Sequence, residues 1–287
     1  NGQGVYSKLW NNGFLDSIHQ GVQFSSGEEP VKYLSDPSFI DRADKRKMLD
    51  ELAALNEESY KEIGDPEIVT KIQQYELAYR MQMEVPGVID LEGETEKTKQ
   101  SYGLNRKETS EFGKQCLMAR RLVEKGVRVV QLYDWGWDTH GTDHDGSIDM
   151  GLRNKCRSID RPMTALLLDL KQRGLLEETL VVWGGEFGRT PMQENREGKK
   201  MGFMGRDHHV DAFTMWMAGG GVKKGTSYGI TDDFGFAGLE ERTSVHDLHA
   251  TILHLMGFDH EQFTYQFQGR PFRLTDVHGE LITKIMA

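Results

Sequence analysis

Three short apolar segments, each next to glycine and to chemically reactive side chains, constrain the fold of this chain more than any other feature. The first, Val127 to Tyr133, runs directly into the sequence Asp-Trp-Gly-Trp-Asp-Thr-His that ends at His140. Short runs rich in β-branched and aromatic residues and bounded by glycine predict buried strands. The three segments and their adjacent polar stretches are 127–133 with 134–140, 180–183 with 184–191, and 213–217 with 205–209.

Amphipathic segments separate these predicted strands. Apolar residues recur at three- and four-residue spacing in residues 110–125 and 150–173, which predicts helices, and Gly126 and Gly174 follow as stop signals. Alternation of helices and strands predicts an α/β fold, a largely parallel sheet flanked by helices on both faces. Sites in such sheets form at the carboxyl ends of the strands. No long apolar segment precedes Val127, so we expect the amino-terminal part of the fold to be absent from this chain, with a weakly encoded first strand as the alternative.

The remaining segments complete a single predicted domain, residues 1–287. Residues 41–106 are interpreted as a helical cover or insertion within it, with two helices joined at the turn Gly64-Asp65-Pro66. Near the carboxyl end, Ser244 predicts the start of a helix that stops at Gly257. Two further predictions are an irregular region with an edge strand at residues 1–36 and a hairpin at residues 265–274.

Composition restricts the classes of partner. The 287 residues carry a formal net charge of −10 and no large basic cluster, so we expect no nucleic-acid partner. No apolar stretch reaches the roughly 18 residues that a membrane span requires. The first residue is Asn1, which suggests a mature, processed or truncated start. The oligomeric state does not follow from these observations.

Five polar residues beside the predicted strands form a candidate metal site. Carboxylate and imidazole groups are ligands for divalent zinc, manganese, calcium or magnesium, depending on the mixture. A carboxylate in such a place can instead cap backbone amides, and a histidine can lie on the surface. The candidate ligands are Asp138, His140, Glu186, Asp207 and His208.

Arg189 is the candidate catalytic residue. Its planar guanidinium could hold an anionic oxygen of a phosphate or sulfate group, or it could form a salt bridge that orients Glu186. Two further histidines, His144 and His246, are weighed as additional site residues. We interpret His144 as part of a solvated loop, whereas His246, near the amino end of its helix, could reach the site.

Four motifs resemble a known family. They are Asp-Thr-His at 138–140, Gly-Gly-Glu-Phe-Gly-Arg-Thr-Pro at 184–191, Gly-Arg-Asp-His at 205–208, and Ser-Val-His-Asp-Leu-His-Ala-Thr-Ile-Leu at 244–253. In these motifs the chain resembles the sulfatase-like family called domain of unknown function 1501, within the alkaline phosphatase and sulfatase superfamily. The resemblance implies an alkaline phosphatase-like domain of which this chain is the carboxyl two-thirds, and it implies export from the cell.

The same resemblance implies site roles. Glu186 stands where the acid of a metal-binding Asp-His pair stands, but Phe187 replaces the histidine. The first metal-binding aspartate and the nucleophile of the superfamily come earlier in the chain than the region that this sequence covers. The nucleophile is therefore not assigned.

The favoured function is a metal-dependent hydrolase of phosphate or sulfate esters that acts on a small anionic ester. The alternative is a non-catalytic binding or scaffold protein that retains the sulfatase-like fold. A third interpretation, a metal-free subunit of a complex, leaves Asp138 and Glu186 as backbone caps.

Overall fold

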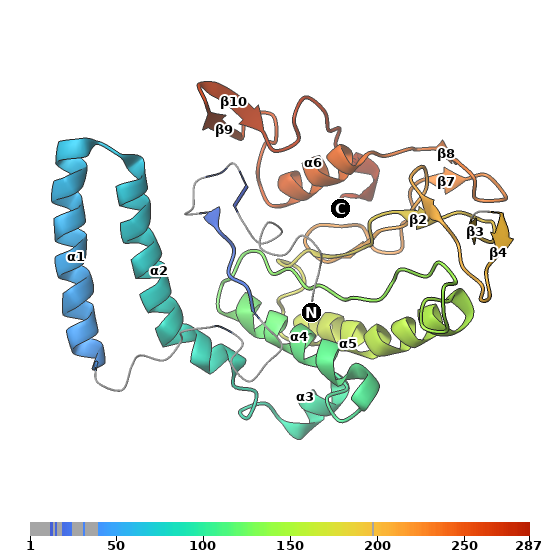
Figure 1. The fold of residues 1–287 in the computed structure, drawn as a ribbon, viewed down its shortest axis with the longest axis horizontal. Coiled ribbons are helices and arrows are strands. Elements are labelled where there is room, and N and C mark those ends of the chain that lie inside the picture. Colours follow the sequence, from blue (N-terminus) through green and yellow to red (C-terminus); the bar gives the residue numbers. More distant parts are fainter. Residues whose placement is uncertain (1–11, 14, 16–18, 25–30, 32–39, 197) are drawn as a thin grey trace. The chain divides into compact units, whose positions relative to one another are not determined.

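The structure is a computed structural model that describes residues 12–13, 15, 19–24, 31, 40–196 and 198–287 (Figure 1). The chain divides into two compact units, residues 1–93 with 267–269 and residues 94–266 with 270–287. Most of the predicted irregular region and edge strand at residues 1–36 lies outside the described residues.

A helical hairpin contains most of the described residues of the first unit. Helix α1 (Arg42–Ile63) ends at Gly64, whose φ of 72° is a left-handed conformation that glycine adopts without strain. Helix α2 (Pro66–Ile89) begins directly afterwards, because the Asp65 side chain accepts a hydrogen bond from the backbone N–H of Glu67. The prediction of two helices joined at this turn is confirmed.

Helices dominate the amino-terminal half of the second unit. They are α3 (Glu96–Ser101), α4 (Lys107–Glu124) and α5 (Arg153–Gln172), with a π-helical turn, η3 (Ile148–Leu152), immediately before α5. Helices α4 and α5 lie side by side and make the most extensive contact between elements in the described chain (Figure 1). Both predicted helices are therefore confirmed, although α4 begins three residues before the predicted start at residue 110.

A buried arginine joins these helices. Arg120 on α4 is only 2% exposed, and its guanidinium lies 2.7 Å from Glu94, 2.6 Å from Glu124 and 3.1 Å from Asp169 on α5. The Tyr102 hydroxyl donates a hydrogen bond of 3.0 Å to Asp169. Only the Glu124 pair also has hydrogen-bond geometry, since Nε and Nη2 of Arg120 make close ion pairs without it. A buried charge is tolerated only when it is paired, so these groups constrain one another.

The strands are short and occur in pairs. Strand β1 (Val181–Trp183) pairs antiparallel with β6 (Trp216–Ala218), and Trp183 is opposite Trp216. The other pairs are β2 (Gly188–Arg189) with β5 (His208–His209), β3 (Asn195–Arg196) with β4 (Lys199–Lys200), β7 (Ile230–Thr231) with β8 (Gly238–Glu240), and β9 (Thr264–Phe267) with β10 (Arg270–Arg273).

The predicted fold class, a largely parallel alkaline phosphatase-like sheet flanked by helices on both faces, is wrong for the described residues. These contain only two-stranded antiparallel pairs. Residues 127–133 form no strand, and Val129 is 70% exposed. Parallel strands need a long crossover, usually a helix, and the residues described between β1 and β6 include no helix. The chain returns through short extended segments instead, which lets β6 run antiparallel to β1.

The carboxyl-terminal elements follow the predicted local signals. Ser244 and Asp247 form a reciprocal capping box at the start of α6 (Val245–Leu255), which ends before Gly257. The β9–β10 hairpin turns at Gln268 and Gly269, both with positive φ, as a type I′ two-residue hairpin turn requires. A 3-10 turn, η4 (Thr283–Ile285), lies near the end of the chain. None of the helices within the described ranges combines the length and the apolar character needed to cross a membrane.

Replacing Arg120 tests the buried ion network. Arg120→Ala removes the buried guanidinium and leaves the carboxylate of Glu94, only 8% exposed, with the partly exposed Arg121 as its remaining partner. We therefore expect the free energy of unfolding to fall by about 3 kcal/mol, the lower end of the range for a broken buried pair. Urea denaturation followed by circular dichroism measures this loss. Lys224→Ala is the control, because Lys224 and Glu177 form an ion pair of 3.6 Å on the surface. This variant should leave the urea midpoint of unfolding unchanged. Equal midpoints for both variants would contradict the assignment.

Candidate metal centre

Three segments that are separated in sequence meet at the candidate site. Strand pairing of β2 with β5 places Arg189 opposite His208. The loop that carries His140 joins them, because the backbone N–H of Arg206 donates to the carbonyl of Thr139 at 3.2 Å. Thr139 is only 2% exposed, so the hydrogen bond between Arg206 and Thr139 is shielded from solvent on the Thr139 side.

A close backbone approach requires glycine at position 205. A Cβ atom on Gly205 would lie 1.9 Å from the carbonyl carbon of His140, far inside any allowed contact. Gly141, with φ of 83°, approaches the carbonyl of Phe203 in the same way, at 2.6 Å from its would-be Cβ. The glycines of the Gly-Arg-Asp-His and Asp-Thr-His-Gly sequences therefore let the two segments touch.

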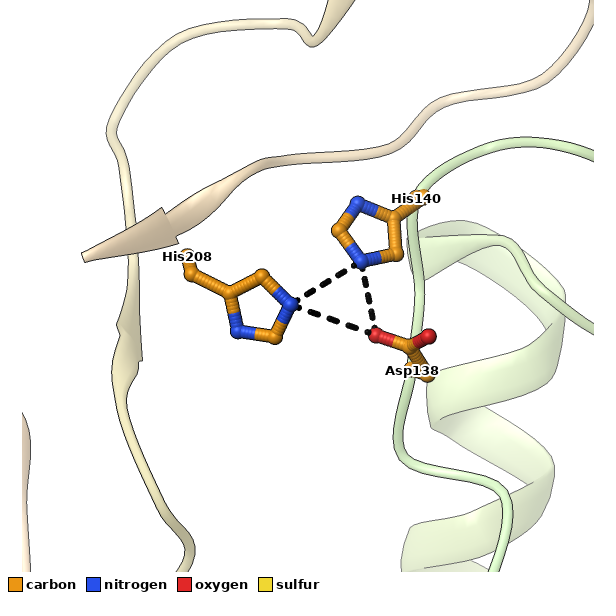
Figure 2. A group of neighbouring side chains, drawn as sticks. All are labelled: Asp138, His140 and His208. Carbon is orange, nitrogen blue, oxygen red and sulfur yellow. Dashed lines mark hydrogen bonds and ion pairs between the residues drawn. The ribbon is translucent and has the colours of Figure 1, made fainter. Parts of the chain in front are cut away.

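Asp138, His140 and His208 bring three ligand atoms together (Figure 2). The Nε2 atom of His140 lies 2.7 Å from Oδ1 of Asp138 and 3.2 Å from Nε2 of His208, and the third side of the triangle measures 3.6 Å. Ligand atoms around a tetrahedral zinc ion lie about 3.3 Å apart, given metal–ligand distances of about 2.0–2.1 Å. The triangle has the size of one face of such a coordination shell.

Each imidazole has a carboxylate on its other nitrogen. Nδ1 of His140 lies 2.5 Å from Glu194, and Nδ1 of His208 lies 2.9 Å from Glu186. A neutral histidine that donates its Nδ1 proton to a carboxylate presents a lone pair at Nε2. Both Nε2 lone pairs would then face the Asp138 carboxylate, and three electron-rich atoms that converge in this way favour a shared cation.

Arg189 lies against this triangle but already has protein partners. Its Nη1 donates to the carbonyl of Arg206 at 2.9 Å, and its Nη2 donates to the carbonyl of Trp137 at 3.1 Å and to Asp138 at 3.2 Å. Nη1 also lies 3.4 Å from Nε2 of His140. These contacts favour a positioning role for Arg189. Its predicted catalytic contact with an anionic oxygen stays a prediction.

The pKa of Asp138 lies below its ordinary value. Desolvation opposes the shift, but the hydrogen bond and the positive charge of Arg189, together with the close approach of His140, outweigh it. The carboxylate form, which binds metal, is therefore favoured over a wider range of pH. The Asp138 side chain is 72% exposed, so solvent screens this interaction and little folding stability depends on it.

The five predicted ligands lie at different distances from the cluster. Asp138, His140 and His208 form it directly, whereas Glu186 contacts the outer nitrogen of His208. Asp207 belongs to a second group with His140 and Glu194. Of the other histidines weighed, His144 pairs with the adjacent Asp145 on an exposed loop, and the ring of His246 packs on His278.

Glu194 is the site residue that sequence analysis missed. Its side chain is only 10% exposed and contacts His140, 54 positions earlier in the chain. Its backbone N–H donates to the carbonyl of Gly205, and Gly205 lies against the backbone of the loop that carries His140. Glu194 lies outside the glycine motif at 184–191 and does not directly follow an apolar run, so only the fold of the 191–205 segment identifies it.

The chain combines α-helices with short antiparallel strand pairs and an open group of two histidines and one aspartate. It belongs to the family described as protein of unknown function (DUF1501), whose family model matches residues 1–286. No curated protein and no solved structure matches the chain.

Removal of the guanidinium should raise the pKa of Asp138. In Arg189→Gln the hydrogen bond and the positive charge are lost, so protonation of Asp138 should begin at higher pH than in the wild type. The small stability that the ionised carboxylate contributes is present above its unfolded pKa and is lost as pH falls through the lowered folded pKa. Carboxyl-carbon NMR titration measures the shift.

The matched control for this titration is Arg161→Gln. Arg161 donates to the carbonyls of Gln100 and Ser101 on an exposed surface. The Asp138 titration should not change in this variant. An unchanged titration in Arg189→Gln as well would contradict the positioning role.

Gly205→Ala tests the close approach of the two segments. The new methyl group must displace the His140 backbone, which should weaken zinc binding by at least about tenfold and lower stability by about 1–3 kcal/mol. Gly202→Ala, in the same segment, introduces a methyl group into open space and is the control. Calorimetric zinc titration and thermal unfolding measure both effects. Wild-type behaviour of Gly205→Ala would refute the steric argument.

Proposed function

We propose that this protein is a metal-dependent hydrolase of phosphate or sulfate esters, with a small anionic ester as its substrate. One observation carries the proposal. The Nε2 atoms of two histidines and a carboxylate oxygen converge within a few ångströms, and each imidazole is held from behind by a second carboxylate. Such carboxylate–histidine pairs orient the ligands of many metal sites.

Among zinc, manganese, calcium and magnesium, zinc fits the ligand set best. Imidazole nitrogen is a preferred ligand of zinc, whereas calcium and magnesium prefer oxygen ligands throughout. Catalytic zinc sites use three protein ligands and leave a position open for a substrate. Here the open side is at Asp138, whose side chain is 72% exposed, while that of His140 is only 9% exposed.

We assign each residue of the site a role in metal binding or in the positioning of the metal ligands. Asp138, His140 and His208 would hold the cation, which would act as a Lewis acid on a non-bridging oxygen of the ester. Glu194 and Glu186 orient the two imidazoles. Arg189 holds Asp138 in place and favours its ionised form. The accumulated positive charge would favour an anionic substrate and stabilise charge that develops on its oxygens.

The likeness of the motifs at 138–140, 184–191 and 205–208 to the alkaline phosphatase and sulfatase superfamily supports the same reaction class. We include membership of that superfamily and export from the cell in the proposal on this likeness alone. Phe187, in place of the expected histidine, leaves one ligand of the superfamily pattern unfilled.

Metal content is the first test of the proposal. Wild-type protein equilibrated with zinc and then freed of excess metal should retain roughly one ion per chain by elemental analysis. His140→Ala and His208→Ala should lose it. His144→Ala is the matched control, because His144 lies on the same loop but outside the cluster, and it should retain the ion. Folded wild-type protein that retains no metal would contradict the site.

Turnover and the supporting carboxylate are the second test. Glu194→Gln should weaken zinc affinity by about 10- to 100-fold, because the carboxylate that orients His140 is lost. Zinc-loaded wild-type protein should hydrolyse aryl phosphate or aryl sulfate, and the rate should follow the zinc content of the variants. Retained zinc without turnover on any ester would favour the alternative of a non-catalytic binding or scaffold protein.

A further inference from the structure

Phe187 places an exposed aromatic ring directly beside the candidate metal ligands. Its ring meets that of His208 edge to face, with centroids 5.7 Å apart and planes at 86°. The side chain is nevertheless 48% exposed. Single exposed apolar residues are common on protein surfaces, so exposure alone carries no argument. The contact with a candidate ligand distinguishes this ring.

The backbone around Phe187 is fixed by packing. A Cβ atom on Gly188 would lie 1.8 Å from the carbonyl oxygen of Ala212, so this segment is pressed against its neighbour. Gly188 also pairs with His209 in the β2–β5 ladder. On the other side, Glu186 contacts His208. The ring is therefore presented at a defined position, which reduces the entropy cost of binding a ligand group against it.

Further exposed apolar side chains lie on the segments that build the site. Gln193 donates from Nε2 to the carbonyl of Phe203 at 3.1 Å, and Glu194 N–H donates to the carbonyl of Gly205. Residues 192–194 and 203–205 therefore run side by side, and Glu194, which orients His140, belongs to the first of these segments. They carry side chains of 42–56% exposure, at Met192, Phe203 and Met204. Methionine is flexible and polarisable, which suits variable apolar ligands.

We propose that the substrate carries an aromatic group, which packs on the Phe187 ring while the anionic ester group meets the Asp138, His140 and His208 centre. This inference rests on the proposed function and names the substrate class within it: aryl esters rather than esters of small polar alcohols. Offset or edge-to-face contact between two rings adds binding free energy beyond the burial of area.

The test compares two non-hydrolysable probes that differ only in the apolar group. Zinc-loaded wild-type protein is titrated by calorimetry with methylphosphonate and with phenylphosphonate. We expect phenylphosphonate to bind about tenfold more tightly, as one added ring contact implies. Phe187→Ala should reduce this preference to about twofold or less, because the affinity for phenylphosphonate should fall more than the affinity for methylphosphonate. Phe187→Tyr, which keeps the ring, should retain the preference.

Phe234→Ala is the matched control, because Phe234 is a phenylalanine of 76% exposure in the turn between β7 and β8. It should retain the preference for phenylphosphonate. Zinc content is measured for every variant, so a damaged centre is recognised by lost metal rather than by lost ligand. Phenylphosphonate that binds no more tightly than methylphosphonate overturns the aryl-ester inference and leaves the proposed function intact. Zinc-loaded protein that binds neither probe overturns both.

Discussion

The His140 imidazole connects parts of the chain that are far apart in sequence, and the geometry of the candidate site depends on it. One nitrogen faces Glu194, and the other faces Asp138 and His208. His140 is only 7% exposed, so these contacts form where water competes little. A shift of this ring would separate the ligands on both of its sides. The backbone contact at Gly205 holds the ring where it is.

The second unit combines two kinds of polar burial with different consequences. Around Arg120, opposite charges neutralise one another on and beside α4 and α5, and the result is a fixed helical layer. Around His140, electron-rich atoms converge with one nearby guanidinium, that of Arg189. The charges around Arg120 are already paired within the protein, whereas the group around His140 favours the binding of an added cation. This difference separates a structural ion network from a candidate functional centre.

Local signals in the sequence predicted the elements more reliably than their assembly. The turn at Gly64, the helix start at Ser244 and the hairpin within residues 265–274 each depend on a few neighbouring residues, and each is present. The prediction of a parallel sheet was wrong because strand pairing depends on partners far along the chain. Val127 to Tyr133 has the composition of a buried strand, yet it forms none among the described residues.

By itself, the sequence determined which side chains are available to the site and the glycines that let their segments approach. Asp138 and His140 were identified because they follow an apolar run preceded by glycine, and His208 because it stands just before another apolar run. Only the tertiary structure decided that Glu194 stands behind His140 and that Arg189 contacts Asp138 rather than Glu186. The physical reason is distance: a carboxylate and an imidazole interact across about 3 Å of space, whatever number of residues separates them in the chain.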